Sequence, residues 1–374
     1  MSILTPVTPR LPVSRRALRS LGLSATLFAG ACSCFGAEAP AAVATPPEPA
    51  TAPAPAAARP RPPQRPFAAV PSPAQTTDNV EFVIGPDYTA APELIAREDV
   101  PKGKIVEFTM NSEDSKIYPG ISKTQPGVVP YKRVVKVYIP SQYVAGTALP
   151  FMVGQDGGYN GFLPTILDNM IHDKRLPVMA AVMIANGGGD GRGSERGLEY
   201  DAVSGLYAQF VETEVLPRIT AEFGITLSKD PAARGTMGGS SGGAAAFSMA
   251  WFRPDLYRRV LTYSGTYTNN QSPMNPESPH GAWGFHEKFI PESDRKPLRV
   301  WLHVSEQDNG ATRDEASFGN WIIANRHMAA ALKAKGYPYR FVFAKEAGHT
   351  DNRVTRQTLP GALEWLWQDY APKP

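Results

Sequence analysis

Cysteine is almost absent from this sequence. The 374 residues contain two cysteines, Cys32 and Cys34, and both lie within residues 1–37. The rest of the chain can therefore form no disulfide bond, offer no thiol nucleophile and supply no cysteine ligand to a metal. Once residues 1–37 are set aside, stability must come from a hydrophobic core, which a chain of this size can bury.

An excess of basic charge is missing from most of the chain. The formal net charge is +3, but residues 1–75 contain seven arginines and only two acidic residues. Residues 76–374 contain 31 basic and 33 acidic residues, which gives no electrostatic reason to expect nucleic acid as a partner. The six histidines show no H-x-x-x-H or H-E-x-x-H spacing. We therefore expect neither a metal nor another cofactor.

The first 37 residues have the pattern of an export signal. The segment SRRALR at 14–19 precedes a short apolar run at 20–31 that ends in small residues. This run is too short to be a good membrane span. A twin-arginine signal, an ordinary secretory signal and a lipoprotein signal that leaves Cys32 first all remain open. We expect a periplasmic or extracellular protein, with a membrane tether as one possibility.

Residues 38–75 contain 13 alanines and 12 prolines. Such a composition cannot bury enough apolar area to fold, and it predicts an extended, semi-rigid spacer. The spacer either holds the rest of the chain away from a membrane or wall, or is a tolerated disordered leader. The expected organisation is an export signal at 1–37, a spacer at 38–75 and one folded domain at 76–374.

From about residue 80, strand patterns alternate with helix patterns. The first two strands, at 104–110 and 133–140, follow each other without a helix, so we expect an antiparallel edge. Further strands are expected at 149–158, 178–189, 233–240, 258–267, 298–308 and 339–349, and helices at 162–174, 203–219, 243–252, 318–335 and 360–370. This alternation predicts an α/β fold, with a mostly parallel sheet covered by helices on both faces. Active groups then belong at the carboxyl ends of the strands.

A glycine- and serine-rich turn separates the expected strand 233–240 from the helix after it. Residues 238–242 match G-x-S-x-G with Ser240 at the centre, and a shift by one residue places Ser241 there instead. Between a strand and a helix this motif indicates a nucleophile elbow. Glycine is needed on both sides because other side chains would collide in so sharp a turn. The N–H groups at the start of the helix favour developing negative charge.

A nucleophilic serine needs a base and an orienting acid. His349 follows the last expected strand and is the candidate base. Asp308 ends the strand before it, and the order Ser240, Asp308, His349 is the order found in α/β-hydrolases. Glu306 and Asp314 remain alternatives for the acid.

We expect the other five histidines to have no direct part in the chemistry. We expect His303 to be a packed core residue within its strand, and His172 and His327 to lie on helices as surface or packing residues. His280 and His286 fall in an insertion, SPHGAWGFHEKF, that could line a substrate cleft.

A tetrahedral oxyanion requires two N–H donors. Ser241, directly after the expected nucleophile, is one candidate, and Gly158, in the glycine turn that ends the stretch 149–158, is the other. An ordinary turn at the strand exit is the alternative explanation for the glycine pair at 157–158.

With these residues in place, the chain resembles the esterase D and enterochelin-esterase-like branch of the α/β-hydrolases, which includes feruloyl and acetyl-xylan esterases. The resemblance runs from about residue 130 to 370. Its carriers include the serine turn at 238–243, DGGY at 156–159 and RGLEYD at 196–201. Members usually have RSFEYD in the last of these places, and we expect this segment to brace a loop near the site.

The resemblance implies Ser240 as the nucleophile, because the family has a double glycine after its motif. It also implies His349 as the base and Asp308 as the acid, although members often carry a longer Gly/Asp loop before the acid. We therefore expect an exported serine carboxylesterase with a small-molecule or glycan-linked ester substrate. A siderophore esterase, an acyltransferase and an inactive, glycan-binding hydrolase fold are the alternatives.

Overall fold

A computed structural model describes residues 80–371 of the chain, except for residues 121–126, 159–160 and 190–191. The expected export signal at 1–37 and spacer at 38–75 lie outside the described residues. Among the residues described, no helix combines the length and apolar character needed to cross a membrane.

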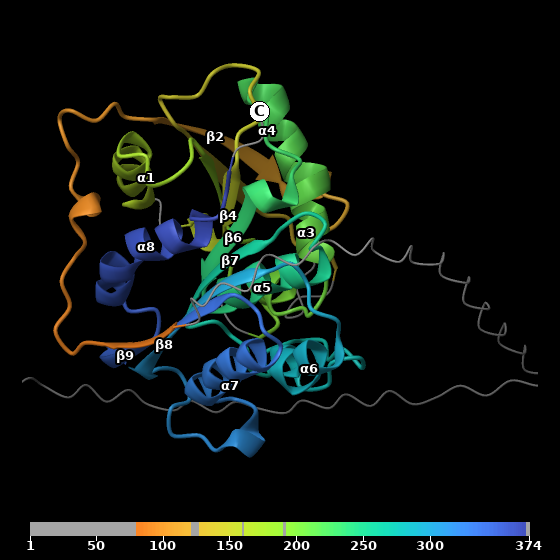
Figure 1. Ribbon diagram of the computed structural model, residues 1–374. Helices are drawn as coiled ribbons and strands as arrows, with labels where there is room; N and C mark the ends of the chain where they lie inside the picture. Colours follow the sequence, from red (N-terminus) through yellow and green to blue (C-terminus); the bar gives the residue numbers. More distant parts are fainter. Residues whose placement is uncertain (1–79, 121–126, 159–160, 190–191, 372–374) are drawn as a thin grey trace, which may run out of the picture. The chain divides into compact units, whose positions relative to one another are not determined.

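A single sheet runs through the described part of the chain (Figure 1). Its order is β1-β9-β8-β7-β6-β4-β5-β3-β2. The strands are β1 Val80–Ile84, β2 Lys104–Asn111, β3 Lys132–Ile139, β4 Phe151–Gly154, β5 Ala180–Ile184, β6 Arg234–Gly239, β7 Arg259–Tyr263, β8 Arg299–Gln307 and β9 Tyr339–Gly348. Strand β3 is antiparallel to both its neighbours, and the other pairs are parallel. The expected antiparallel edge is therefore confirmed.

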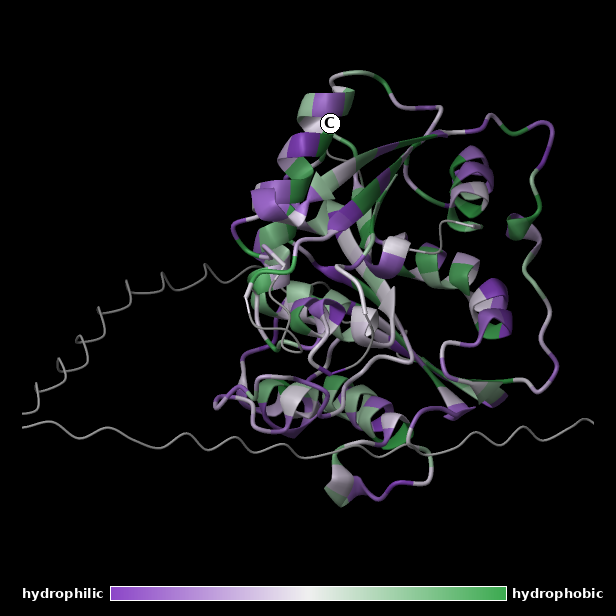
Figure 2. Cartoon of the chain, turned by 180° about the vertical axis from the view of Figure 1, so that it is seen from behind, coloured by the Kyte–Doolittle hydropathy of each residue, from purple (hydrophilic) through white to green (hydrophobic). Residues whose placement is uncertain are grey.

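Helices cover both faces of the sheet, as the α/β pattern predicted. They are α1 Leu163–His172, α2 Glu195–Tyr200, α3 Leu206–Phe210, α4 Leu216–Phe223, α5 Ser241–Phe252, α6 Ile290–Glu292, α7 Trp321–Ala334 and α8 Asn352–Trp367. Helices α1 and α8 pack against one face, and α3, α4, α5 and α7 against the other (Figure 1). Figure 2 shows hydrophobic and hydrophilic residues alternating along the outer helices, as expected where a helix has an apolar face toward the sheet. Helix α5 differs, because it is buried almost completely.

The hydrophobic core consists of two layers, one on each face of the sheet. Neighbouring residues of one strand belong to different layers: in β7, Val260 packs with the α5 side and Leu261 with the α8 side. This follows from the alternation of side chains along a strand. Both residues are fully buried.

Two helices differ from their expected bounds. Helix α8 begins at Asn352, where the side chain of Asp351 accepts the N–H of Arg353 at 2.8 Å, and it carries Pro360 in its interior. The expectation of a helix starting at Pro360 took this proline for a first-turn residue. The expected helix 203–219 is instead α3 and α4, joined by a π-helical turn, Val211–Val215, and it ends at Phe223.

Parallel strands β4, β6, β7, β8 and β9 all end at the same edge of the sheet. We call this edge, with the loops that follow these strands, the carboxyl edge. It is where an α/β sheet of this kind places its active groups.

Candidate active site

Ser240 lies in the tight turn between β6 and α5. Its backbone has φ 55° and ψ −131°, a conformation that residues with a side chain rarely adopt. The N–H of Ser240 donates to the carbonyl of Tyr263 at 2.9 Å, and its own carbonyl accepts the N–H of Thr266 at 3.0 Å. The end of β7 and the residues after it therefore hold the strained turn in place.

The glycines around Ser240 are required by close contacts. A Cβ on Gly238 would lie 2.3 Å from the carbonyl oxygen of Gly242. A Cβ on Gly242 would lie 2.9 Å from Oδ2 of Asp156, in the turn after β4. Ser241 is the first residue of α5 and is buried, whereas Ser240 is half-buried and stands in the turn itself. The geometry therefore favours the frame centred on Ser240.

The carboxyl edge brings together the three side chains that the sequence singled out. Nε2 of His349 lies 2.8 Å from Oγ of Ser240, and Nδ1 of His349 lies 2.6 Å from Oδ1 of Asp308. Asp308 directly follows β8, and His349 directly follows β9. The Asp308 side chain is fully buried, while that of His349 is 22% exposed. A continuous hydrogen-bonded chain thus runs from the core to the partly exposed serine.

Several hydrogen bonds keep the buried Asp308 ionised. Burial alone would raise its pKa, but the hydrogen bond with His349 and the donors around it outweigh this, so the pKa of Asp308 lies below its usual value. Oδ2 accepts the hydroxyl of Ser264 at 2.7 Å and the N–H of Ser305 at 3.1 Å. Oδ1 accepts the N–H of Asn309 at 2.8 Å. An ionised acid in this place favours a proton on Nδ1 of His349.

Ser264 is a member of the site that the sequence argument did not identify. It directly follows β7, is fully buried and has a φ of 48°. Its hydroxyl donates to Asp308 and accepts the N–H of Thr350 at 3.1 Å, so it links the acid to the residue after His349. The sequence offered one sign of this role, which is that Ser264 lies toward the carboxyl end of an expected parallel strand.

Neither of the alternative acids, Glu306 and Asp314, nor the nearby Asp351 takes the place of Asp308 beside His349. Oε2 of Glu306 accepts the N–H of Glu346 at 2.9 Å. Asp314 precedes the short turn Glu315–Ser317, and Asp351 caps α8 and pairs with Arg353. Within the described residues, Asp308 is the carboxylate that forms an ion pair with the histidine at position 349.

The turn after β4 corrects one expected oxyanion donor. Asp156, Gly157 and Gly158 all have positive φ, at 56°, 78° and 53°. The N–H of Gly158 donates to the carbonyl of Gln155 at 2.9 Å, because the chain closes a tight turn there. Gly158 therefore has no free N–H for a ligand in this conformation. Ser241 begins α5, where the first N–H groups lack acceptors within the helix.

The other histidines contact residues other than Ser240, Asp308 and His349. His303 is fully buried, and burial lowers its pKa to about 4, which confirms it as a packed core residue. Burial and the neighbouring His327 lower the pKa of His286 to about 3. His280 pairs with Glu287 at 2.9 Å. Within the described residues, no group of three or more His, Cys, Asp or Glu side chains is placed to hold a metal ion.

The segment RGLEYD braces the carboxyl edge. The guanidinium of Arg196 forms an ion pair with Asp156 at 2.8 Å. Glu199 pairs with Arg133 of β3, and both side chains are almost completely buried. The hydroxyl of Tyr200 accepts the N–H of Asp156 at 3.1 Å. These contacts match the bracing role expected from the sequence.

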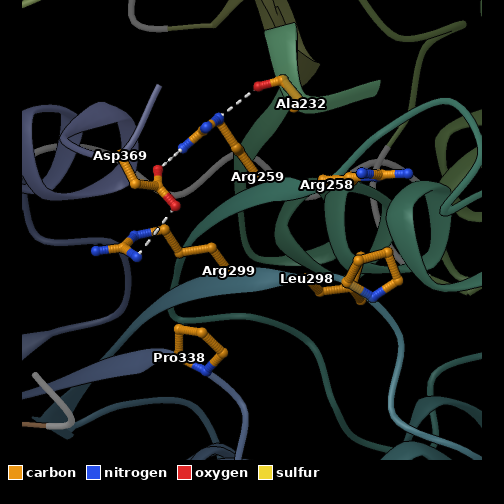
Figure 3. Close-up of a pocket in the computed structure, with 8 residues that line it drawn as sticks. Ala232, Arg258, Arg259, Leu298, Arg299, Pro338 and Asp369 are labelled. Atoms are coloured by element: carbon orange, nitrogen blue, oxygen red, sulfur yellow. Dashed lines mark hydrogen bonds and ion pairs between the residues drawn. The ribbon is translucent and has the colours of Figure 1, made fainter. Parts of the chain in front are cut away.

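A cavity of about 190 Å³ lies at the opposite edge of the sheet, where β7 and β8 begin (Figure 3). Arg259 donates to Asp369 at 2.6 Å and to the carbonyl of Ala232 at 2.7 Å. Arg299 reaches the other oxygen of Asp369 at 3.5 Å. These groups tie the end of α8 to the strands, and the serine site lies at the other end of the same strands.

Comparisons with known proteins show which family the chain belongs to. The family model described as "Putative esterase" matches residues 128–366. Among solved structures, enterobactin esterase from Shigella flexneri, in the presence of enterobactin, matches with 20% identity and a TM-score of 0.50, over 73% of this chain and 60% of that chain. A ferulic acid esterase matches with 18% identity and a TM-score of 0.50, over 72% of this chain and 100% of that chain.

The chain thus spans about 60% of the length of the enterobactin esterase. No curated protein gives a significant match. At these identities the solved structures establish the α/β-hydrolase fold, and the family model establishes the family. The chain belongs to this esterase family.

Proposed function

We propose that the protein is an exported serine carboxylesterase that cleaves acyl esters of sugars or of aromatic acids. The observation that carries the proposal is the hydrogen-bonded chain Ser240–His349–Asp308, with separations of 2.8 Å and 2.6 Å. Both distances are within the reach required of a nucleophile with its base and of a base with its orienting acid.

In the first half of the reaction, Oγ of Ser240 attacks the ester carbonyl while Nε2 of His349 accepts the hydroxyl proton. Asp308 holds the Nδ1–H of His349 and stabilises the imidazolium. When the tetrahedral intermediate collapses, the C–O bond to the alcohol breaks and His349 gives its proton to the leaving alkoxide. An acyl ester on Ser240 remains.

In the second half, His349 removes a proton from water, and the resulting hydroxide attacks the acyl carbonyl. Collapse releases the carboxylic acid and returns the proton to Ser240. The oxyanion of both tetrahedral intermediates lies by the N-terminus of α5, where the N–H of Ser241 serves as a donor. We expect the second donor in the turn after β4, at a residue other than Asp156 and Gly158, whose N–H groups already donate within the protein.

The substrate class rests on the family and on the two kinds of esterase with the same fold. One is a ferulic acid esterase and the other an enterobactin esterase whose structure was solved in the presence of enterobactin. Sugar-linked acetate, feruloyl esters and a catechol-siderophore triester are therefore the substrates to compare. If the protein cleaves only the siderophore ester, the result supports a siderophore esterase and contradicts the proposed cleavage of carbohydrate esters.

The experiment combines labelling with a substrate panel. A fluorophosphonate probe should label the protein, and mass spectrometry should place the adduct on Ser240. The three ester classes are then assayed with and without a competing alcohol, which distinguishes hydrolysis from acyl transfer. A protein that neither reacts with the probe nor cleaves any short-acyl ester would contradict the proposal and support the inactive, glycan-binding alternative.

We also propose that residues 1–37 direct export and that residues 38–75 space the enzyme from the cell envelope. The support is the sequence pattern alone: paired arginines, a short apolar run and a Pro/Ala-rich segment. Sequencing of the mature N-terminus tests this. A lipid-modified Cys32 indicates a membrane tether, a cut elsewhere before residue 38 indicates a free exported enzyme, and an uncut cytoplasmic chain contradicts the proposal.

A further inference from the structure

A carboxylate that the proposed mechanism does not use lies beside the N-terminus of α5. Oδ2 of Asp156 is 2.9 Å from the place that a Cβ on Gly242 would occupy, and Gly242 is the second residue of that helix. The Asp156 side chain is 32% exposed. Asp156 also has a positive φ of 56°, so the backbone is held in a strained form to put the residue there.

This position creates an electrostatic conflict. The partial positive charge at the start of α5 attracts an anion. During catalysis that anion is the oxyanion formed when Ser240 attacks, and an uncompensated Asp156 carboxylate next to it would repel the developing charge. A negative side chain at this place is therefore compatible with ester hydrolysis only if another group neutralises it.

Arg196 supplies that neutralisation with two parallel hydrogen bonds. Nε donates to Oδ1 of Asp156 at 2.9 Å and Nη2 donates to Oδ2 at 2.8 Å. The side-chain amide of Asn186, after β5, donates to the same Oδ1 at 2.7 Å. The Arg196 side chain is only 11% exposed, so solvent screens this pair less than it would a surface pair.

The same helix also holds the backbone of Asp156. Tyr200 lies four residues after Arg196 in α2, and residues at this spacing share one face of a helix. Its hydroxyl accepts the N–H of Asp156 at 3.1 Å, and the Arg196 guanidinium lies 5.3 Å from the centre of its ring. Helix α2 therefore contacts the turn after β4 twice, at the carboxylate of Asp156 and at its backbone N–H.

We propose that Arg196 is a positioning residue for catalysis that acts through Asp156. It cancels the carboxylate beside the oxyanion and keeps the turn after β4 in its left-handed form. This inference rests on the proposed role of Ser240 as the nucleophile. This role differs from a purely structural one. A structural role requires only that Arg196 contact the turn, whereas the proposed role requires that its charge neutralise that of Asp156.

The test measures the second-order rate of Ser240 labelling by a fluorophosphonate, with kcat and KM for p-nitrophenyl acetate. Arg196→Gln should slow labelling and lower kcat by about 10- to 100-fold, somewhat less than the ~10²–10³ lost with an oxyanion donor, and should leave KM within about threefold. The double variant Arg196→Gln with Asp156→Asn should be at least about fivefold faster than Arg196→Gln, since the uncompensated charge is gone. Arg218→Gln, which removes a surface pair with Glu222, is the matched control.

A second comparison covers the case in which Arg196→Gln does not fold, as judged by thermal melting. Asp156→Asn alone keeps a residue that tolerates positive φ and removes the negative charge. Its labelling rate should exceed that of Arg196→Lys, which keeps the carboxylate but loses the two-pronged contact. The reverse order would overturn the inference.

Other outcomes separate this inference from the proposed function. If the single and double Arg196 variants are equally slow, Arg196 is a brace only, and the inference is wrong. If Arg196→Gln matches the wild type, it is also wrong. If the wild-type protein itself is not labelled at Ser240, the proposed function fails, and the inference fails with it.

Discussion

Strained backbone gathers at one edge of the sheet. Seven non-glycine residues in the described part of the chain have positive φ. Six of them lie in or beside the carboxyl-edge loops: Asp156, Ser240, Ser264, Phe318, Glu346 and Thr350. The seventh, Lys174, follows α1. Each such conformation costs on the order of 1–3 kcal/mol, so this edge stores energy that the rest of the fold must supply.

The opposite edge uses similar side chains without that strain. Arg259 and Arg299 begin β7 and β8 in ordinary strand geometry, and they bind Asp369 and the final carbonyls of α8 (Figure 3). The carboxylate there joins two cations, whereas Asp308 at the carboxyl edge meets one histidine and several neutral donors. Charged groups at one edge therefore close the structure, and those at the other are placed to take a proton from a strained serine. Substitutions at the two edges should accordingly change different measured quantities.

The largest effect is expected at the point of greatest strain. Ser240→Ala removes the nucleophile and should lower kcat by about 10³- to 10⁶-fold without lowering stability. Ser241→Ala should cost less than about tenfold, because the mechanism uses only the Ser241 backbone. Steady-state rates with p-nitrophenyl acetate measure both. If the Ser241 variant is inactive and the Ser240 variant is active, the nucleophile is Ser241 and the motif is centred one residue later.

Substitution of the buried acid, Asp308, should cause the second largest loss of activity. Asp308→Asn keeps the shape but presents the wrong hydrogen-bonding group to Nδ1 of His349, so the histidine adopts the wrong tautomer. We expect kcat to fall by about 10³- to 10⁴-fold. Glu306→Gln is the matched control, since Glu306 accepts the N–H of Glu346 instead. Equal losses in the two variants would mean that the acid is not specific to position 308.

The hydroxyl of Ser264 should matter less, because it acts through Asp308. Ser264→Ala removes one donor from a fully buried carboxylate and one acceptor from the N–H of Thr350. We expect kcat to fall about 10- to 100-fold, consistent with one charge-assisted hydrogen bond. Ser305→Ala is the control, because Ser305 reaches Asp308 through its backbone. A Ser264→Ala enzyme with unchanged kcat would limit this serine to a packing role.

These residues also show what the sequence can reveal about the site. The proximity of Ser240, Asp308 and His349 could be predicted because each stands at a strand end in a chemically distinctive place, and strand ends meet at one edge. Ser264 carries no motif, and its role depends on a positive φ that a serine rarely shows. The donor at Gly158 was misassigned, because sequence shows where glycines are but not which N–H groups they leave free.

The fold was predictable where hydrophobic periodicity is strong. The strands from β2 to β9 lie within or near their expected ranges, and so do most flanking helices, although α8 begins well before its expected start at Pro360. Strand β1 was missed: its side chains are mostly exposed, and it pairs with β9, some 260 residues later in the chain, which no local pattern can indicate. Helix α2 was missed because six residues are too few to show a period.

At the opposite edge, substitution should lower stability and leave catalysis intact. Arg259→Met leaves Asp369 and the carbonyls of Leu366 and Ala232 without their shared donor. We expect a loss of about 1–2 kcal/mol, which is a few degrees in Tm, with kcat within about twofold of the wild type. Arg258→Met is the control, because its Nε makes one 3.3 Å hydrogen bond to a carbonyl. A fall in kcat at unchanged Tm would contradict the division between the edges.

The smallest effect concerns a buried acid beside the carboxyl edge. Burial, with Glu199 nearby, raises the pKa of Glu195 to about 7, against the opposing influence of Arg133 and Tyr131. In the unfolded chain this carboxyl titrates near its ordinary value, so between that pH and about 7 the folded state holds the proton and the unfolded state does not. The free energy of unfolding therefore falls as pH rises through this window.

Glu195→Gln keeps the shape of the side chain and removes this titration. The variant should match the wild type in Tm at pH 4 and exceed it at pH 8, by about 1 kcal/mol after allowance for solvent screening. Melting curves at the two pH values measure the difference, and Glu287→Gln, at an exposed position, is the control. A gain at pH 8 would show that the carboxyl edge holds an unfavourable charge as well as strained backbone. A loss at pH 8 would instead mean that Glu195 stabilises the fold as an anion, through Arg133, and that the energetic contrast between the two edges rests on backbone strain alone.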